Sequence, residues 1–297
     1  MKTIIACTDF SPSATNAVHY AAALAAAAKT KLVLFRYFEY PVAATDLPLP
    51  QGYITAFGDE MAAESERQLQ EIKAELTRTY PIEIQCVVRS LSLHGDLEEI
   101  FHAEQANLVV MGMEGHNKVV NALAGNVTTA AIRHGNLPLL VVPQGVVFHP
   151  VKKILFSCDD QAIPNPDTLR ILRELAIVFD AYIEVLNLYD LEKMTSTATQ
   201  GLRPAAKINL ETMLAGTRHG YFYKIEEVAD KGILYEAVRS SADLVAMIPH
   251  HHSFWSTLLN QSETQRIATT ITLPLLVLGE KVQHLTEVEL EEIAASL

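Results

Sequence analysis

Short apolar runs alternate with longer helical patterns along the first half of the chain. The apolar runs are rich in β-branched residues and have the length of strands buried on both faces. They lie at residues 3–8, 31–37, 82–89, 107–112 and 138–142. Alanine-rich or amphipathic stretches lie between them and predict helices at residues 13–28, 59–79, 96–105 and about 126–134. Strands that alternate with helices in this way predict an α/β fold, with an open parallel five-stranded sheet and helices on both faces.

The boundaries of two elements carry their own signals. Ser11 or Ser13 can cap the N-terminus of the first helix, because a serine hydroxyl accepts a hydrogen bond from a free backbone N–H. Residues 39–58 contain three prolines, at positions 41, 48 and 50, and we therefore predict a loop there.

The second half of the chain repeats the first. KTIIACTD at 2–9 aligns with KKILFSCD at 152–159, and residues 107–142 align without a gap with residues 243–278, including an identical Leu-Pro-Leu-Leu-Val. The period is too long for a solenoid, so two copies of one domain are expected. We place them at 1–146 and 147–297, because residues 143–151 contain two prolines and a glycine, which suit a linker. The last eleven residues, 287–297, predict an additional helix.

Composition restricts the function more than the fold. The chain has 297 residues, of which 49% are hydrophobic, and its formal net charge of −12 argues against non-specific nucleic-acid binding. The three cysteines are far apart, which argues against a disulfide framework and favours a reducing compartment. The longest apolar run, at residues 20–28, is too short to span a bilayer, and the run at the start of the sequence is too short for the core of a signal peptide. The sequence therefore predicts a soluble cytoplasmic protein without membrane contact.

Candidate chemistry lies at the carboxyl ends of the predicted strands, where open parallel sheets bind ligands. Asp9 follows the first strand, Tyr37 ends the second, and Gly112 ends the fourth. If the first and fourth strands are neighbours, Asp9 and Gly112 face one crevice, where the carboxylate can accept hydrogen bonds from ribose hydroxyls or an adenine amino group. Gly125 and Asn126 begin the next helix, whose free N–H groups and dipole favour phosphate. This arrangement outlines a nucleotide site.

These residues resemble the universal stress protein family, and the doubled length resembles its tandem members. The resemblance rests on Asp9, on the spacing Gly112-x2-Gly115-x9-Gly125, on Val127-Thr128 and on the following Pro-Leu-Leu-Val-Val. It implies the strand order 3-2-1-4-5 in each copy and, in the ATP-binding branch of the family, a bound adenine nucleotide, with or without Mg²⁺. The residues that it implies as ligand contacts are Thr8, Asp9, Tyr37, Met111, Gly112, Gly115, Gly125, Asn126, Val127 and Thr128.

The resemblance has one departure and one competing interpretation. The family usually has Ser or Thr where Asn126 stands, although an amide can also donate to a phosphate oxygen. The competing interpretation is structural: glycines between a strand and a helix are often only turn formers, and Asp9 can simply begin the helix together with Ser11. Loop residues His116 and Lys118 are open to the same two interpretations, phosphate contact or solvated loop.

The second copy lacks the glycines. Across the alignment, Ile248 replaces Gly112, His251 replaces Gly115 and Gln261 replaces Gly125, so we expect no equivalent nucleotide site there. The run His250-His251-His252 suggests a metal, but adjacent histidines in a loop usually point apart, and we predict none.

Two classes of function follow. One is a stress-response module that binds ATP and acts through protein partners that the sequence does not identify. The other is an enzyme, either a slow ATPase or a relative of the ATP pyrophosphatases. The second is disfavoured because TDFSPS has no glycine-rich turn and because Glu114 is the only acid in the glycine loop. The apolar LPLLVV strands are expected at a sheet edge, where they would join the two copies as a pseudo-dimer or join two chains as a homodimer.

Overall fold

Ten strands form one sheet in the structure, which is a computed structural model. It describes residues 1–38, 51–89, 93–113, 131, 136–158, 163–189, 204–225, 229–248 and 273–279. The strands of the first half are β1 (Thr3–Cys7), β2 (Lys31–Tyr37), β3 (Ile84–Arg89), β4 (Leu108–Met113) and β5 (Leu139–Pro143). Those of the second half are β6 (Lys153–Cys158), β7 (Tyr182–Tyr189), β8 (Arg218–Ile225), β9 (Leu244–Met247) and β10 (Leu275–Val277).

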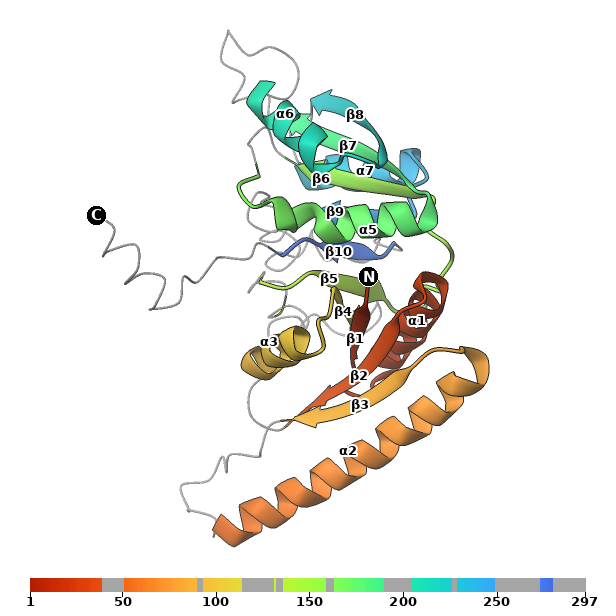
Figure 1. Ribbon diagram of the computed structural model, residues 1–297, viewed down its shortest axis with the longest axis vertical. Helices are drawn as coiled ribbons and strands as arrows, with labels where there is room; N and C mark the ends of the chain where they lie inside the picture. Colours follow the sequence, from red (N-terminus) through yellow and green to blue (C-terminus); the bar gives the residue numbers. More distant parts are fainter. Residues whose placement is uncertain are drawn as a thin grey trace, which may run out of the picture.

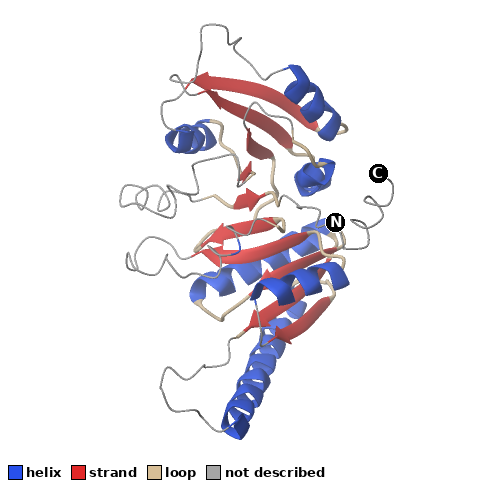
Figure 2. Cartoon of the chain, turned by 90° about the vertical axis from the view of Figure 1, so that its left-hand side faces the viewer, coloured by secondary structure: helices blue, strands red, loops and turns tan. Residues whose placement is uncertain are grey.

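The strand order is β3-β2-β1-β4-β5-β10-β9-β6-β7-β8, which contains the order 3-2-1-4-5 twice. All pairs within each half are parallel, and the halves meet where β5 pairs antiparallel with β10. Figure 2 shows the strands of both halves as one continuous stack. The α/β class and the repeated order are therefore confirmed. The LPLLVV strand of the first half and the corresponding LPLLVL strand of the second half do meet, and their pairing turns two five-stranded sheets into one.

Helices cover both faces of this sheet. One face carries α1 (Pro12–Ala28), α2 (Gln51–Thr79), α5 (Arg170–Phe179) and α6 (Pro204–Met213), whose apolar residues share one buried cluster with the sheet. The other face carries α3 (Leu93–Ala103) and α7 (Ala229–Arg239), which share a second cluster. A short 3-10 helix, η2 (Pro166–Leu169), precedes α5. Each cluster contains residues from both halves, because the antiparallel junction keeps the same face of the sheet continuous.

The repeat seen in the sequence extends to backbone geometry. Lys29 and Asp180 end α1 and α5 in the left-handed region, with φ of 55° and 50°. Asn107 and Asp243 occupy equivalent positions before β4 and β9. The Asn107 Oδ1 accepts the backbone N–H of Lys2 at 2.7 Å, while the Asp243 Oδ2 accepts those of residues 152 and 153 at 2.7 and 2.9 Å. The Asn/Asp-Leu-Val start common to both copies thus anchors the first strand of each half.

Helix α2 corrects the predicted loop. It begins at Gln51, so residues 51–58 are helical and only 39–50, which lie outside the described residues, remain of that prediction. All three prolines precede Gln51, and therefore none interrupts the helix. Gly52 and Gly58 each disfavour a helix by about 1 kcal/mol, but the helix continues through both. Figure 1 shows α2 at one end of the molecule, beside the edge strand β3. The strands of the first half and its helices α1 and α3 lie within a few residues of their predicted positions, and Ser11 caps α1 by accepting the N–H of Ala14 at 3.3 Å. Of the helix predicted at about 126–134 only residue 131 is described, and the helix predicted at 287–297 lies outside the described residues.

The segment between β5 and β6 packs against both halves. The Phe148 ring lies edge-on to Tyr20 of α1, with centroids 5.3 Å apart, and 6.0 Å from Phe179 of α5. The Asn16 amide of α1 also donates to the carbonyls of Pro143 and Val146 at 3.2 and 3.1 Å. These contacts fix the path of the chain from one half to the other.

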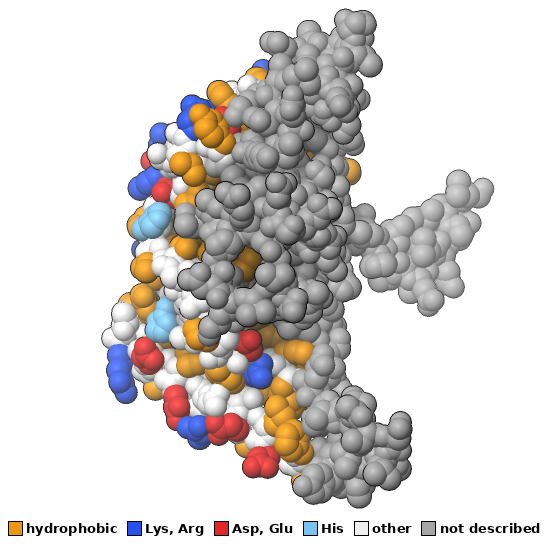
Figure 3. Space-filling view, turned by 180° about the vertical axis from the view of Figure 1, so that it is seen from behind, with side chains coloured by type: hydrophobic (Ala, Val, Ile, Leu, Met, Phe, Trp, Pro, Cys, Tyr) orange, Lys and Arg blue, Asp and Glu red, His pale blue; other side chains and the backbone are white. Residues whose placement is uncertain are grey.

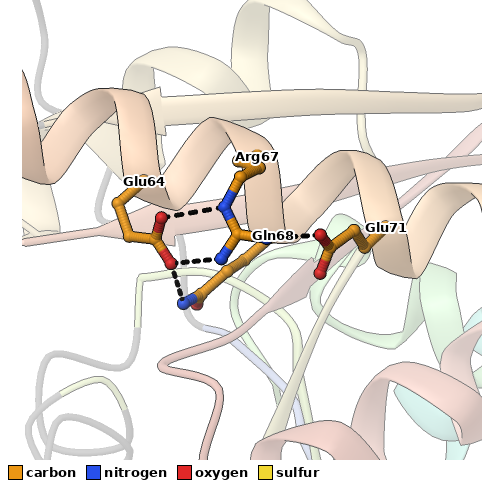
Figure 4. Close-up of polar contacts among 4 residues, drawn as sticks. All are labelled: Glu64, Arg67, Gln68 and Glu71. Atoms are coloured by element: carbon orange, nitrogen blue, oxygen red, sulfur yellow. Dashed lines mark hydrogen bonds and ion pairs between the residues drawn. The ribbon is translucent and has the colours of Figure 1, made fainter.

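The exposed face of α2 carries a charged cluster. Arg67 lies between Glu64 and Glu71, and its Nε and Nη2 donate to the two Glu64 carboxylate oxygens at 2.9 and 2.6 Å (Figure 4). The hydrogen bonds from Arg67 lower the pKa of Glu64. Because these side chains are solvent-exposed, the pairs contribute little to stability. On the face seen in Figure 3, acidic and basic side chains of the described residues are interspersed. No helix in the described part of the chain has the length and hydropathy needed to cross a membrane.

Candidate functional site

The carboxyl ends of β2, β1 and β4 lie side by side, and the described residues of the predicted nucleotide site lie there. Strand β1 pairs with β2 through Cys7 and Phe35, and with β4 through Ala6 and Val110. The β1–β4 neighbourhood expected from the crevice argument is therefore present. Strand order reverses between these two strands, since β2 and β3 lie on one side of β1 while β4 and β5 lie on the other. Ligands bind at such switch points in open α/β sheets.

The loop from β1 to α1 is built by its own polar side chains. The Thr8 hydroxyl accepts the N–H of Phe10 at 3.0 Å, and the Asp9 Oδ1 accepts the N–H of Ser11 at 3.0 Å. Phe10 takes a φ of 66°, in the left-handed region that non-glycine residues seldom adopt. Asp9 is exposed, and Oδ1 is used within the loop. Asp9 thus helps to begin α1, as the structural interpretation predicted, and its carboxylate is also exposed at the carboxyl end of β1.

Tyr37 and Met111 lie on the face of the sheet that carries α3. Met111 is 2% exposed and belongs to the buried cluster with α3, and Tyr37 packs partly buried against the same cluster. Thr8 is also buried, at 4% exposed. Its backbone N–H donates to the carbonyl of Phe35 at 2.9 Å and continues the β1–β2 pairing. The described members of the predicted site thus lie at one edge of the sheet, and Asp9 is the most exposed of them.

Gly112 has a structural reason to be glycine. A Cβ at this position would lie 2.5 Å from the carbonyl carbon of Ser13 and 2.8 Å from the backbone nitrogen of Ala14. Both atoms belong to the first turn of α1, which crosses β4 at this point. Backbone atoms cannot move aside as the end of a side chain can, so the close approach of α1 to β4 requires glycine. The role of Gly112 in ligand contact stays a prediction.

Sequence reasoning missed Arg36, which precedes Tyr37 at the end of β2. Its guanidinium lies over the Phe10 ring, 5.3 Å from the centroid. Its Nε is buried and has no hydrogen-bond partner among the described residues. Burial lowers the pKa of Arg36, and the nearby negative charge of Asp9 opposes that shift. The sequence did carry a signal for Arg36, because it is a charged residue inside the mostly apolar run KLVLFRY.

Part of the predicted site lies outside the described residues: Gly115, Gly125, Asn126, Val127 and Thr128, together with Glu114, His116, Lys118 and the histidines 250–252. The phosphate half of the predicted site therefore stays a prediction. Among the residues that the structure describes, no group of three or more His, Cys, Asp or Glu side chains could hold a metal ion.

The corresponding edge in the second half has different chemistry. Ile248, which replaces Gly112, is 2% exposed and packs in the buried cluster beneath α5 and α6. Asn187 of β7 has the same position in the sheet as Arg36 of β2. Cys158 at the end of β6 pairs with Asn187, and this pairing corresponds to that between the ends of β1 and β2. The Asn187 amide is 1% exposed and donates to the carbonyl of Cys158 at 3.1 Å. A neutral buried amide therefore stands where the first half has a cation.

Comparison with known proteins identifies the family to which the first half of this chain is related. The sequence model of the universal stress protein family matches residues 1–143. Through this first half, the chain belongs to the universal stress protein family. No curated protein is similar enough in sequence to match the chain.

Solved structures extend the likeness to the whole length. A universal stress protein from Archaeoglobus fulgidus is 13% identical and aligns over 93% of this chain and 98% of its own, with a TM-score of 0.65. A putative universal stress protein from Pseudomonas aeruginosa is 14% identical over 99% and 98% of the two chains, with a TM-score of 0.53. A third match, a universal stress protein in complex with cAMP, is 23% identical over 48% and 98% of the two chains, with a TM-score of 0.35. At these identities, the likeness of the first two shows the fold, and it covers both halves.

Proposed function

We propose that the first half of this protein binds an adenine nucleotide, with ATP as the ligand, and that the chain acts as a regulatory module in a stress response. The observation that carries the proposal is the exposed Asp9 carboxylate at the switch point between β1 and β4. A carboxylate there accepts hydrogen bonds from hydroxyl or amino groups, which the nucleoside supplies. Membership of the first half in the universal stress protein family supports the same ligand class.

The contacts of ATP divide into two groups in this proposal. Thr8, Asp9 and the backbone of Tyr37 hold the adenosine, with Met111 and Gly112 beside the ribose. Gly115, Gly125, Asn126, Val127 and Thr128 line the phosphates, where backbone N–H groups at a helix start favour negative charge. Binding without dedicated hydrolysis follows from the lack of a marked base and metal ligand in the sequence around the glycine loop.

The second half serves as a structural partner of the first. Residues 1–146 and 147–297 form two domains in this proposal, paired as a pseudo-dimer within one chain. The antiparallel β5–β10 pairing supports it, because it satisfies the edge strand that each half would otherwise expose. Only one nucleotide per chain is expected, since Ile248 fills the position of Gly112. The net charge and the wide separation of the three cysteines favour a cytoplasmic location.

Equilibrium dialysis with ATP and with adenosine tests this function. Wild type should bind one ATP per chain, and a stoichiometry of two would contradict the assignment of the second half. Asp9→Ala should weaken ATP and adenosine alike, because its partners are on the nucleoside. Mass spectrometry of ligand released from freshly purified protein identifies the nucleotide independently of the added one.

Gly125→Ala is the matched variant for the phosphate half. It should weaken ATP and leave adenosine almost unchanged, because an added Cβ obstructs approach of phosphate to the backbone. If the variant instead unfolds more easily but keeps its ATP affinity when folded, Gly125 is only a turn former. Wild type that binds neither ATP nor adenosine would refute the proposed function.

A further inference from the structure

The carboxyl edge of the first half holds two opposite charges that do not pair with each other. Asp9 and Arg36 interact through space, and the negative charge of Asp9 favours the protonated guanidinium. Among the described residues, however, no carboxylate lies within the 4 Å of an ion pair from Arg36. The two groups instead have separate local supports: Asp9 is held by the N–H of Ser11 at 3.0 Å, and Arg36 lies over the Phe10 ring.

Arg36 is held over the Phe10 ring, while its buried Nε has no hydrogen-bond partner among the described residues. A guanidinium has five N–H donors in a fixed planar fork that matches the oxygens of phosphate or carboxylate. The Nε donor is buried without a partner among the described residues, and leaving such a donor unsatisfied costs free energy. The aromatic face beneath the guanidinium attracts the cation without consuming any N–H group. The ring fixes the position of the charged group, and the guanidinium N–H groups other than the buried Nε can donate to an incoming anion.

The charge of the whole chain makes this position important. With a formal net charge of −12, the protein repels anionic ligands at long range. A nucleotide can therefore bind only where a local cation or a set of N–H groups offsets that field. The second half has the neutral Asn187 at the equivalent position, and its amide already donates to the carbonyl of Cys158. The cation is thus a property of the first half alone.

We infer that Arg36, supported by the Phe10 ring, is a specificity-determining residue that binds a phosphate group of the ligand, while Asp9 binds a hydroxyl or amino group of the nucleoside. Asp9 and Arg36 then match a ligand that has hydrogen-bond donors at one end and anionic acceptors at the other. This inference rests on the proposed nucleotide site. It adds to that site a selection for phosphorylated over unphosphorylated nucleosides at the strand edge, separate from the glycine loop.

Calorimetric titration of wild type, Arg36→Gln and Arg36→Lys with ATP and with adenosine tests the inference. Arg36→Gln should weaken ATP about 10-fold or more, because charge-assisted hydrogen bonds are the strong ones, and should change adenosine by about twofold at most. Arg36→Lys should recover part of the ATP affinity, since it keeps the charge and loses the fork. Thermal unfolding without ligand establishes that each variant is folded.

Arg89→Gln is the matched control. Arg89 is exposed at the end of the next strand, β3, where it pairs in register with Tyr37. The Arg89→Gln substitution therefore removes the same charge from the same edge of the sheet. It should leave both affinities within about twofold of wild type. Equal losses in the Arg36 and Arg89 variants would mean a diffuse electrostatic effect and would overturn the inference.

Two other outcomes distinguish this inference from the proposed function. If wild type binds ATP and Arg36→Gln binds it equally well, or if Arg36→Gln weakens ATP and adenosine by the same factor, only the role of Arg36 is refuted. If wild type binds neither ligand, the proposed nucleotide site is refuted and the role of Arg36 with it.

Discussion

Replacing Gly112 with alanine tests whether helix packing requires this glycine. The added Cβ would meet the backbone of Ser13 and Ala14, at 2.5 Å from the Ser13 carbonyl carbon and 2.8 Å from the Ala14 nitrogen. Relief requires α1 to move away from β4, and α1 is packed along its length through buried alanines. Overpacking a filled core costs about 1–3 kcal/mol, and a clash with backbone belongs at the upper end of that range. We therefore expect Gly112→Ala to lower the free energy of unfolding by about 3 kcal/mol.

Two other glycines provide matched controls because each isolates one physical effect. Gly145 has a φ of 87° and nothing within 4 Å of an added Cβ, so Gly145→Ala meets only the left-handed backbone cost of about 1–2 kcal/mol. An added Cβ at Gly220 would meet the hydroxyl end of the Tyr182 side chain, which can turn away. The expected order of destabilisation is Gly112→Ala first, then Gly145→Ala, then Gly220→Ala.

Thermal unfolding followed by circular dichroism measures this series. At about 2–4 °C per kcal/mol for a domain of 150–250 residues, Gly112→Ala should lower the Tm by roughly 6–12 °C. A Tm within about 2 °C of wild type, or a smaller loss than for Gly145→Ala, would refute the packing argument. If that stable variant also failed to bind ATP, Gly112 would be glycine for the ligand and not for the helix.

Two further predictions concern the anchors at the amino ends of the strands. Asp243→Ala leaves two backbone N–H groups at the start of β6 without their acceptor and should lower the free energy of unfolding, measured by denaturant titration, by about 2–3 kcal/mol. Asp243→Asn should lower it by about half as much, because one side-chain oxygen remains. Equal losses in the two variants would contradict this account. The Lys31 ammonium, at 2.7 Å, lowers the pKa of Glu104, so the stabilisation from this carboxylate is present above the ordinary glutamate pKa of about 4.3 and is lost as the pH falls through the lowered value. The difference in Tm between wild type and Glu104→Gln should therefore shrink from pH 6 to pH 3, and a difference that stays constant would show that Glu104 acts through packing alone.

The elements of the first half were predictable because their signals are local. KLVLFRY forms a strand over the predicted residues 31–37, since a short apolar run of this length is typical of a strand buried on both faces of a sheet. Ser11 caps α1 as expected, because the cap needs only a hydroxyl three residues before the N–H that it accepts. The internal repeat likewise predicted the second sheet, and Asn107 and Asp243 show why that repeat starts with a short polar side chain.

The start of α2 shows where local signals fail. Prolines at 41, 48 and 50 suggested a loop through residue 58, but a proline influences mainly its own position and the residue before it. The helix from Gln51 passes through Gly52 and Gly58 despite their low helical propensity. Tertiary packing can override a propensity of about 1 kcal/mol per residue, and a single sequence does not contain that term.

The sequence by itself determined the α/β class, the duplication, and the placement of Asp9, Tyr37 and Gly112 at strand ends, because periodicity is a property of neighbouring residues and the repeat is visible by aligning the sequence with itself. Only the tertiary structure showed which of these residue types are also required by contacts within the protein, independently of ligand binding. Gly112 and Ser13 are 99 positions apart in numbering, and Arg36 at the end of β2 contacts Phe10 in the loop that follows the neighbouring strand β1. The antiparallel pairing of β5 with β10 joins residues more than 130 positions apart. Such contacts depend on the path of the whole chain, and a local pattern of apolar and polar residues does not encode them.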